Sequence, residues 1–414
     1  MTTVSIVGGG VHGTHLAVRL LDSELVTHDQ VRIADPDGLL ANLRRQCEQC
    51  GMTALRSPFV HSVDTDPFSL RDYARSTGRM DELLSSEFGG DRPTASLFFD
   101  HAQAVCAEYD LGSLVLDDRV QCLEENAAEV RLETTGGSFS TDWCLLAVGH
   151  GRSLATPEWA SDLPDDVPAT HVWDPAFDPE GVGPQASVGI VGGGITAAQL
   201  AATLAQPGRD VTMFARSPLR VKTLEADTDW MHFSTVVEEL QELPPASKAR
   251  EQAVDAVRHD GTIPPHVFGP LRRAIEDGAV DLQQTTITEC TPAGGTLVVT
   301  CENGRARCLD RLVFATGFAS PYDAELLRQV RTESDLETGY RGAPALDDET
   351  LRWRRRDGSL SRVFVSGCAA QQVLGPFARN IVGARRAGSL VADELGRLVE
   401  PVRSTASPPT GVVE

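Results

Sequence analysis

The chain is poor in lysine and has no long hydrophobic run. Lys222 and Lys248 are its only lysines, and 37 basic against 59 acidic residues give a formal net charge of −22. Nucleic-acid binding needs a basic surface, so this balance argues against a nucleic-acid partner. No stretch approaches the roughly 20 consecutive apolar residues that span a bilayer, and no basic segment precedes the first apolar stretch as in a signal peptide. We therefore expect a cytoplasmic protein that does not enter a membrane.

The nine cysteines form neither a disulfide framework nor a metal-binding pattern. Their number is odd and they are scattered along the chain, as in cytosolic proteins with reduced thiols. Only Cys47 and Cys50 form a C-x-x-C pair, and a zinc site would normally need a second pair. His12 and His15 have the spacing of metal ligands, but they lie within a glycine-rich turn. We therefore expect no metal site, and Cys47 and Cys50 are the one candidate redox pair.

A glycine-rich turn follows the first apolar segment. Residues 3–7 have the β-branched pattern of a buried strand and run into Gly8-x-Gly10-x-x-Gly13, which precedes a helix-like segment. The first glycine permits a tight turn, the second lets a pyrophosphate approach the backbone, and the third lets the helix pack on the strand. Asp35 ends the next strand about 20 residues later, where a carboxylate can bind a ribose. These residues predict a dinucleotide site.

The same pattern recurs in the middle of the chain. Residues 187–191 lead into Gly192-x-Gly194-x-x-Ala197, again followed by a helix-like segment. The next strand ends near Arg216 and not at an acid. Because an arginine at this position can accommodate a 2′-phosphate, the second motif predicts NADPH in preference to NADH.

Two such motifs resemble the flavoproteins with two dinucleotide-binding domains, in which the first motif holds FAD and the second holds NAD(P)H. Residues 145–151 resemble the strand by which the chain leaves the FAD domain. Residues 312–318 resemble the Ala-Thr-Gly strand of flavin monooxygenases and N-hydroxylases, and residues 363–367 resemble the last FAD-domain strand. The resemblance implies further cofactor contacts at Gly149, Thr316, Gly317 and Gly367.

Within this group the chain resembles most the lysine and ornithine N-hydroxylases of siderophore biosynthesis and their short uncharacterised relatives. The resemblance rests on residues 51–58 and 66–73, and on His171-Val172-Trp173 ahead of the second motif. It implies a FAD-dependent, NADPH-using monooxygenase in which the cofactor carries the chemistry and O2 oxygenates a small molecule such as an amine. By this resemblance only, Arg56 is a candidate substrate contact.

Two other functions remain open at this point. A pyridine-nucleotide-dependent disulfide reductase would use Cys47 and Cys50 as its redox pair. A non-catalytic sensor would bind flavin and nucleotide without turnover.

The motifs predict an α/β protein with two Rossmann-like domains, the NAD(P)H domain inserted into a discontinuous FAD domain. We expect the FAD domain to comprise residues 1–165 and 308–398, and the NAD(P)H domain to comprise residues 184–307. Residues 228–278 of the inserted domain have a mostly helical pattern. Residues 399–414 are expected to form a disordered tail.

Overall fold

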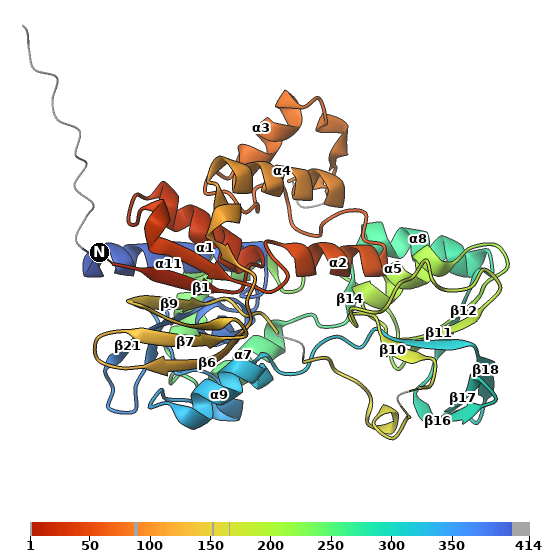
Figure 1. Ribbon diagram of the computed structural model, residues 1–414. Coiled ribbons are helices and arrows are strands. Elements are labelled where there is room, and N and C mark those ends of the chain that lie inside the picture. The colour runs from red at the N-terminus through yellow and green to blue at the C-terminus, as the bar shows by residue number, and fades with distance from the viewer. Residues whose placement is uncertain (1, 87–89, 151–152, 165, 400–414) are drawn as a thin grey trace, which may run out of the picture.

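The structure, a computed structural model, describes residues 2–86, 90–150, 153–164 and 166–399. Its elements form two α/β units, each built on a mainly parallel sheet (Figure 1). The predicted α/β fold with two Rossmann-like units is thereby confirmed. The predicted tail falls almost entirely outside the described residues.

The first unit is built on a sheet of strand order β20-β21-β9-β1-β2-β5. Its strands are β1 (Val4–Val7), β2 (Val31–Ala34), β5 (Val115–Leu116), β9 (Trp143–Leu146), β20 (Arg352–Arg354) and β21 (Leu360–Val365). All neighbouring strands are parallel except β20, which is antiparallel to β21. Helices α1 (Val11–Asp22) and α11 (Ile381–Leu398) pack together along this sheet. An antiparallel sheet and a helix also belong to this unit: β6 (Val120–Glu125), β7 (Val130–Thr134), β8 (Gly137–Thr141) and α9 (Glu325–Glu333).

The second unit is built on a parallel sheet of strand order β10-β19-β11-β12-β15. Its strands are β10 (Ala169–His171), β11 (Ser187–Val191), β12 (Asp210–Ala215), β15 (Val280–Gln284) and β19 (Arg311–Phe314). Helices α5 (Ile195–Leu204) and α8 (Pro265–Glu276) pack on this sheet. The antiparallel strands β16 (Ile287–Ala293), β17 (Thr296–Cys301) and β18 (Ala306–Leu309) lie on its other side (Figure 1).

Helix α2 (Ala41–Cys50) extends from the first unit and packs on α5 of the second. A small layer projects above α1 and α2 in Figure 1 and consists of α3 (Ser69–Ser76), β3 (Leu83–Leu84), β4 (Arg92–Pro93) and α4 (Ala95–Glu108). Short single-turn helices occur at η1 (His28–Gln30), η2 (Met80–Glu82), η3 (Leu111–Leu114), η4 (Glu158–Ala160) and η8 (Tyr340–Gly342).

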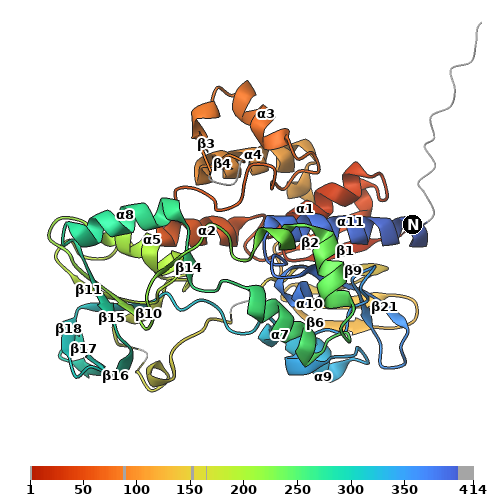
Figure 2. The ribbon, with the colours of Figure 1, turned by 180° about the vertical axis from the view of Figure 1, so that it is seen from behind.

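A helical excursion leaves the second unit and packs on the first. It starts and ends at a two-stranded stem, β13 (Arg220–Val221) paired with β14 (Thr262–Ile263). Between them lie η5 (Thr228–Met231), α6 (Phe233–Val236), η6 (Val237–Gln241) and α7 (Lys248–Val257). Helix α7 contacts α10 (Gln371–Leu374), as Figure 2 shows from behind. Trp230 is buried in the same apolar cluster as Phe377, so it has a packing role in this interface.

The strand pairing corrects the predicted domain limits. β19 pairs with β10 and β11, so the Ala-Thr-Gly strand belongs to the second sheet and not to the first, where a boundary at residue 308 had placed it. β10 likewise lies before the predicted start at residue 184. The excursion of residues 228–257 packs on the first unit although it is inserted in the second. These limits depend on pairing between distant segments, which local patterns do not reveal.

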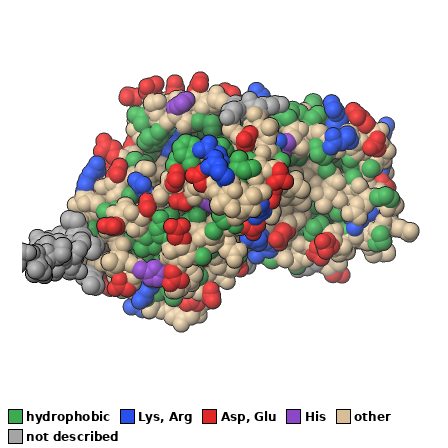
Figure 3. All heavy atoms as spheres, turned by 90° about the horizontal axis from the view of Figure 1, so that it is seen from above, with side chains coloured by type: hydrophobic (Ala, Val, Ile, Leu, Met, Phe, Trp, Pro, Cys, Tyr) green, Lys and Arg blue, Asp and Glu red, His purple; other side chains and the backbone are tan. Residues whose placement is uncertain are grey.

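Acidic side chains are spread over the face of the molecule shown in Figure 3, in keeping with the net charge of −22. Among the described helices, none combines the length and apolar character that crossing a bilayer requires.

Candidate functional site

The first glycine turn lies at the carboxyl edge of the first sheet, between β1 and α1. Gly8 has a positive φ of 107°, and a Cβ there would lie 2.5 Å from the carbonyl oxygen of Ala147. A Cβ on Gly13 would overlap the carbonyl oxygen of Gly8. By contrast Gly10, the N-cap of α1, has open space where its Cβ would be. Gly8 and Gly13 therefore close the turn, while Gly10 leaves room for a ligand in front of the helix N-terminus.

Asp35 follows β2 and holds this turn in place. Its carboxylate accepts hydrogen bonds from the backbone N–H groups of Gly9 at 2.6 Å, Asp37 at 2.9 Å and Gly38 at 3.1 Å. Gly149 follows β9 and Gly367 begins η9 (Gly367–Ala370) directly after β21, both with positive φ. The predicted residues of the first motif therefore gather at one carboxyl edge. Because the strand order reverses between β1 and β9, this edge is a topological switch point.

His12 and His15 have separate partners on α1. Nδ1 of His12 lies 2.7 Å from the Ser366 hydroxyl, whereas Nδ1 of His15 lies 2.9 Å from the carbonyl oxygen of Val63. Burial is the main cause that lowers the pKa of each imidazole to about 4. Both rings are therefore neutral at pH 7 and bind structural partners.

The second glycine turn repeats the first at the carboxyl edge of the second sheet. Gly192 has a φ of 151°, and a Cβ there would lie 2.5 Å from the carbonyl oxygen of Ala315 and 3.2 Å from Cβ of Ala197. Gly194 is the N-cap of α5. The turn lies between β11 and β19, where the order of the second sheet reverses.

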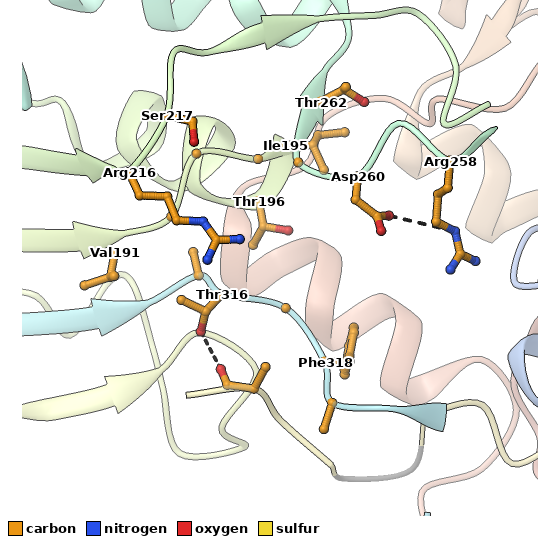
Figure 4. Close-up of a pocket in the computed structure, with 18 of the residues that line it drawn as sticks. Val191, Ile195, Thr196, Arg216, Ser217, Arg258, Asp260, Thr262, Thr316 and Phe318 are labelled. Atoms are coloured by element: carbon orange, nitrogen blue, oxygen red, sulfur yellow. Dashed lines mark hydrogen bonds and ion pairs between the residues drawn. The ribbon is translucent and has the colours of Figure 1, made fainter. Parts of the chain in front are cut away.

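A cleft of about 1520 Å³ opens in front of this second turn and reaches the first unit. Its second-unit wall includes Thr196, Arg216 and Thr316 (Figure 4). The guanidinium of Arg216 is directed into the space before Thr196 and Thr316. The Thr316 hydroxyl donates a hydrogen bond to the carbonyl oxygen of Ala155, which fixes the Ala-Thr-Gly strand end against the chain that enters the second unit.

Three rings stack along the cleft where the two units meet. His150 and Phe318 are stacked at 4.7 Å between ring centroids with 15° between their planes, and Trp173 stacks on Phe318 at 6.4 Å and 13°. All three line the cleft. Burial, and then the charge of Arg379, lower the pKa of His150 to about 4, so this ring is neutral at pH 7.

Arginines surround the inner part of the cleft. Asp260 lies between two of them, with Oδ1 3.8 Å from Nε of Arg258 and 3.4 Å from Nη2 of Arg379. Burial lowers the pKa of Arg258, and the neighbouring charge of Arg379 lowers it further. Together with Arg216 and Arg220 these side chains give the cleft a positive side that suits a phosphorylated ligand.

Arg56 lines the cleft, but its guanidinium already has protein partners. It donates to the carbonyl oxygens of Thr223 at 2.6 Å and Lys222 at 2.8 Å, and to the Thr262 hydroxyl at 3.2 Å. Arg56 thus connects the first unit to the stem of the excursion. Its candidate role as a substrate contact stays a prediction.

Cys47 and Cys50 are not among the residues that line the cleft: Cys47 packs in the core of the first unit, and Cys50 packs with α5 in the core of the second. Both side chains are buried, and the Cys50 thiol lies 3.5 Å from Oε1 of Gln199. Burial is the main cause that raises the pKa of both thiols well above its usual value. A buried thiol that does not ionise is a poor redox nucleophile, so the geometry does not support a dithiol mechanism.

Sequence reasoning missed several cleft residues. Phe318 was within a recognised motif, but nothing in the sequence connects it with His150 or Trp173. Arg258 and Asp260 lie in an ordinary charged stretch at the end of α7, which is typical of a solvated helix face.

Comparisons with known proteins agree with this architecture. The family model described as FAD-NAD(P)-binding matches residues 5–151, which contain the first glycine turn. No curated protein sequence matches the chain.

Several solved structures share the whole fold. The ornithine hydroxylase of Pseudomonas aeruginosa is 15% identical with a TM-score of 0.74, over 95% of this chain and 98% of its own. An ornithine N-hydroxylase of Kutzneria sp. 744, in a structure with reduced FAD, NADP+ and L-ornithine, is 14% identical with a TM-score of 0.74, over 96% and 99%. A bacillithiol disulfide reductase of Bacillus cereus is 14% identical with a TM-score of 0.60, over 96% and 99%.

Proposed function

We propose that the protein is a FAD-dependent, NADPH-using flavin monooxygenase of the N-hydroxylase type that acts on a small amine. The observation that carries this proposal is the pair of glycine turns, each at the switch point of its own parallel sheet, with one cleft reaching from the second turn to the first unit. In this proposal the first unit binds FAD and the second binds NADPH. The similarity in fold to the N-hydroxylases supports it.

The residues present fit both dinucleotides. Open space at Gly10 and the N-terminus of α1 suit a pyrophosphate, and the carboxylate of Asp35 lies where it would accept hydrogen bonds from the hydroxyls of a ribose. Gly192, Gly194 and the N-terminus of α5 provide the same features in the second unit, and Arg216 suits a 2′-phosphate. Contacts at Gly149, Thr316, Gly317, Gly367 and Ala197 complete the proposed sites.

The reaction consumes a neutral amine, O2, NADPH and a proton, and yields a hydroxylamine, NADP+ and water. Bound FAD would supply the electron transfer and oxygen activation that amino-acid side chains lack. The protein's own residues orient the two cofactors toward the cleft, and the stacked rings of His150, Phe318 and Trp173 exclude water from part of it. The neutral His150 adds no charge beside the reacting groups.

The alternative disulfide reductase shares the fold, since fold alone does not select chemistry. The buried, protonated thiols of Cys47 and Cys50 disfavour it. All nine cysteines are unpaired, which supports the proposed reducing, cytoplasmic environment.

The test is to load the protein with FAD, reduce it without oxygen by NADPH or NADH, and then mix it with O2 in the presence of an amine. We expect faster flavin reduction by NADPH, a transient absorbance distinct from oxidised and reduced flavin, and one hydroxylamine for each NADPH. Hydrogen peroxide as the only product with every amine would contradict the monooxygenase. Absence of flavin reduction by either nucleotide would favour the non-catalytic sensor.

A further inference from the structure

The cleft has a buried carboxylate on the wall that the excursion provides. Glu251 lies on α7, lines the cleft and is only 6% exposed. Its Oε2 accepts hydrogen bonds from the Tyr322 hydroxyl at 2.8 Å and from Nε2 of Gln372 at 2.8 Å, and Oε1 accepts one from Nε2 of Gln371 at 3.1 Å. Tyr322 lies in η7 (Pro321–Asp323) and both glutamines lie in α10, so two separate segments converge on this carboxylate of α7.

All of these partners are neutral. Burial, and then the charge of Glu251, raise the pKa of Tyr322 well above its usual value, so the phenol keeps its proton. In the described part of the chain Glu251 makes no ion pair, because its neighbour Arg250 points away and pairs with Asp348 through contacts of 2.5 and 2.8 Å. A buried carboxylate without a cation is costly, and its persistence at a cavity wall indicates that a ligand provides the charge.

The glutamine pair beside Glu251 differs in position, since Gln371 lines the cleft and Gln372 is not among its lining residues. Gln372, buried beside Glu251, donates through its amide nitrogen, but its Oε1 has no hydrogen-bond partner. Asp255 and Asp323 also line the cleft, and Arg258 and Arg341 lie near Asp255.

We infer that this acidic wall, Glu251 with Gln371, Gln372 and Tyr322, binds an ammonium group of the substrate and that Glu251 determines specificity for it. An ammonium in the cleft supplies the positive charge that Glu251 lacks and an N–H donor for its carboxylate. A protonated nitrogen has no lone pair to oxygenate, so the bound ammonium is a positioning group and the reacting nitrogen is a second, neutral one. The inference rests on the proposed function only for the reaction and not for the binding.

The test compares Glu251→Gln with Glu239→Gln in the FAD-loaded protein. Glu251→Gln removes the charge and keeps the shape, with one acceptor oxygen replaced by an amide donor, and Glu239 is an exposed acid of the same excursion. Calorimetry at pH 7 with cadaverine, L-lysine and n-pentylamine measures binding, with 1-pentanol as the uncharged control. We expect Glu251→Gln to weaken the binding of ammonium probes by about tenfold or more, because a desolvated charge pair is lost. Glu239→Gln should match the wild type.

Flavin reduction by NADPH is the second readout, and it should change less than about twofold in Glu251→Gln if the wall serves the substrate. Equal binding of cadaverine by wild type and variant, or no binding of any ammonium probe by the wild type, would overturn the inference. Slower reduction with unchanged ammonium binding would also overturn it, because the wall would then serve the cofactor.

Asp255→Asn keeps the inference testable should Glu251→Gln fail to fold. Asp255 is exposed on the same helix face, so we expect a loss of binding of only about twofold, as for screened charges. No loss would count against the acidic wall. If the ammonium probes bind as expected but no hydroxylamine forms, the proposed reaction fails while the ammonium site stands.

Discussion

Two glycines of the first turn have different roles: Gly13 is needed for folding, and Gly10 is needed for ligand binding. A Cβ on Gly13 would overlap the carbonyl oxygen of Gly8, whereas Gly10 has negative φ and open space around its Cβ position. We expect Gly13→Ala to destabilise the protein by about 1–3 kcal/mol or more, since the helix must shift from the strand. Gly10→Ala should leave the unfolding midpoint of the FAD-free protein unchanged but weaken FAD binding. Urea unfolding and flavin titration of both variants decide this, and equal effects of the two would contradict it.

A second single residue, Arg216, is expected to determine the preference for NADPH over NADH. Its guanidinium lines the cleft where the proposed 2′-phosphate would lie. We expect Arg216→Gln to lower kcat/KM of flavin reduction with NADPH by roughly 10- to 100-fold, about 1.4–2.8 kcal/mol, and to leave NADH unchanged. Arg272→Gln, on the exposed face of α8, serves as the control. An equal loss of kcat/KM with both nucleotides would show that Arg216 does not bind the 2′-phosphate.

A largely buried ion pair helps to attach α7 to the first unit. Arg250 is fully buried and pairs with Asp348 through two contacts, while its Nε donates to the carbonyl oxygen of Leu243 at 2.9 Å. We expect Arg250→Met to lower the free energy of unfolding by about 3–5 kcal/mol, because Asp348 loses its partner. Arg75→Met at the exposed pair with Asp72 should cost less than about 1 kcal/mol. Thermal melts of the two variants would contradict this if their losses were similar.

Elements that depend on local sequence were predicted well, and elements that depend on distant pairing were not. The glycine turns were predicted because neighbouring residues alone determine a strand, a tight turn and a helix start. β19 was assigned to the wrong unit because its partners β10 and β11 lie far away in sequence. Cys47 and Cys50 have the spacing of a redox pair, yet tertiary packing buries them, Cys47 in the core of the first unit and Cys50 in the core of the second.

At the scale of the whole molecule, the cleft is a product of the inserted topology. Glu251, Tyr322 and Gln371 come from segments that no local pattern connects, and they meet only because the excursion returns to the first unit. The cofactor motifs could therefore be predicted from the sequence alone. The acidic wall and the stack of His150 and Phe318 were not, because each requires the two units to be assembled.

The net charge of −22 should make stability depend strongly on salt. Like charges on the surface repel one another in the folded state, and the screening length falls from about 10 Å at 0.1 M to about 3 Å at 1 M salt. We expect KCl to raise the melting temperature of the protein at pH 7.5 over this range. Close to the sequence pI of about 4.8 the repulsion is nearly balanced, so the salt-induced shift should be much smaller there. An equal rise at both pH values would assign the effect to strengthened hydrophobic burial and not to screened repulsion.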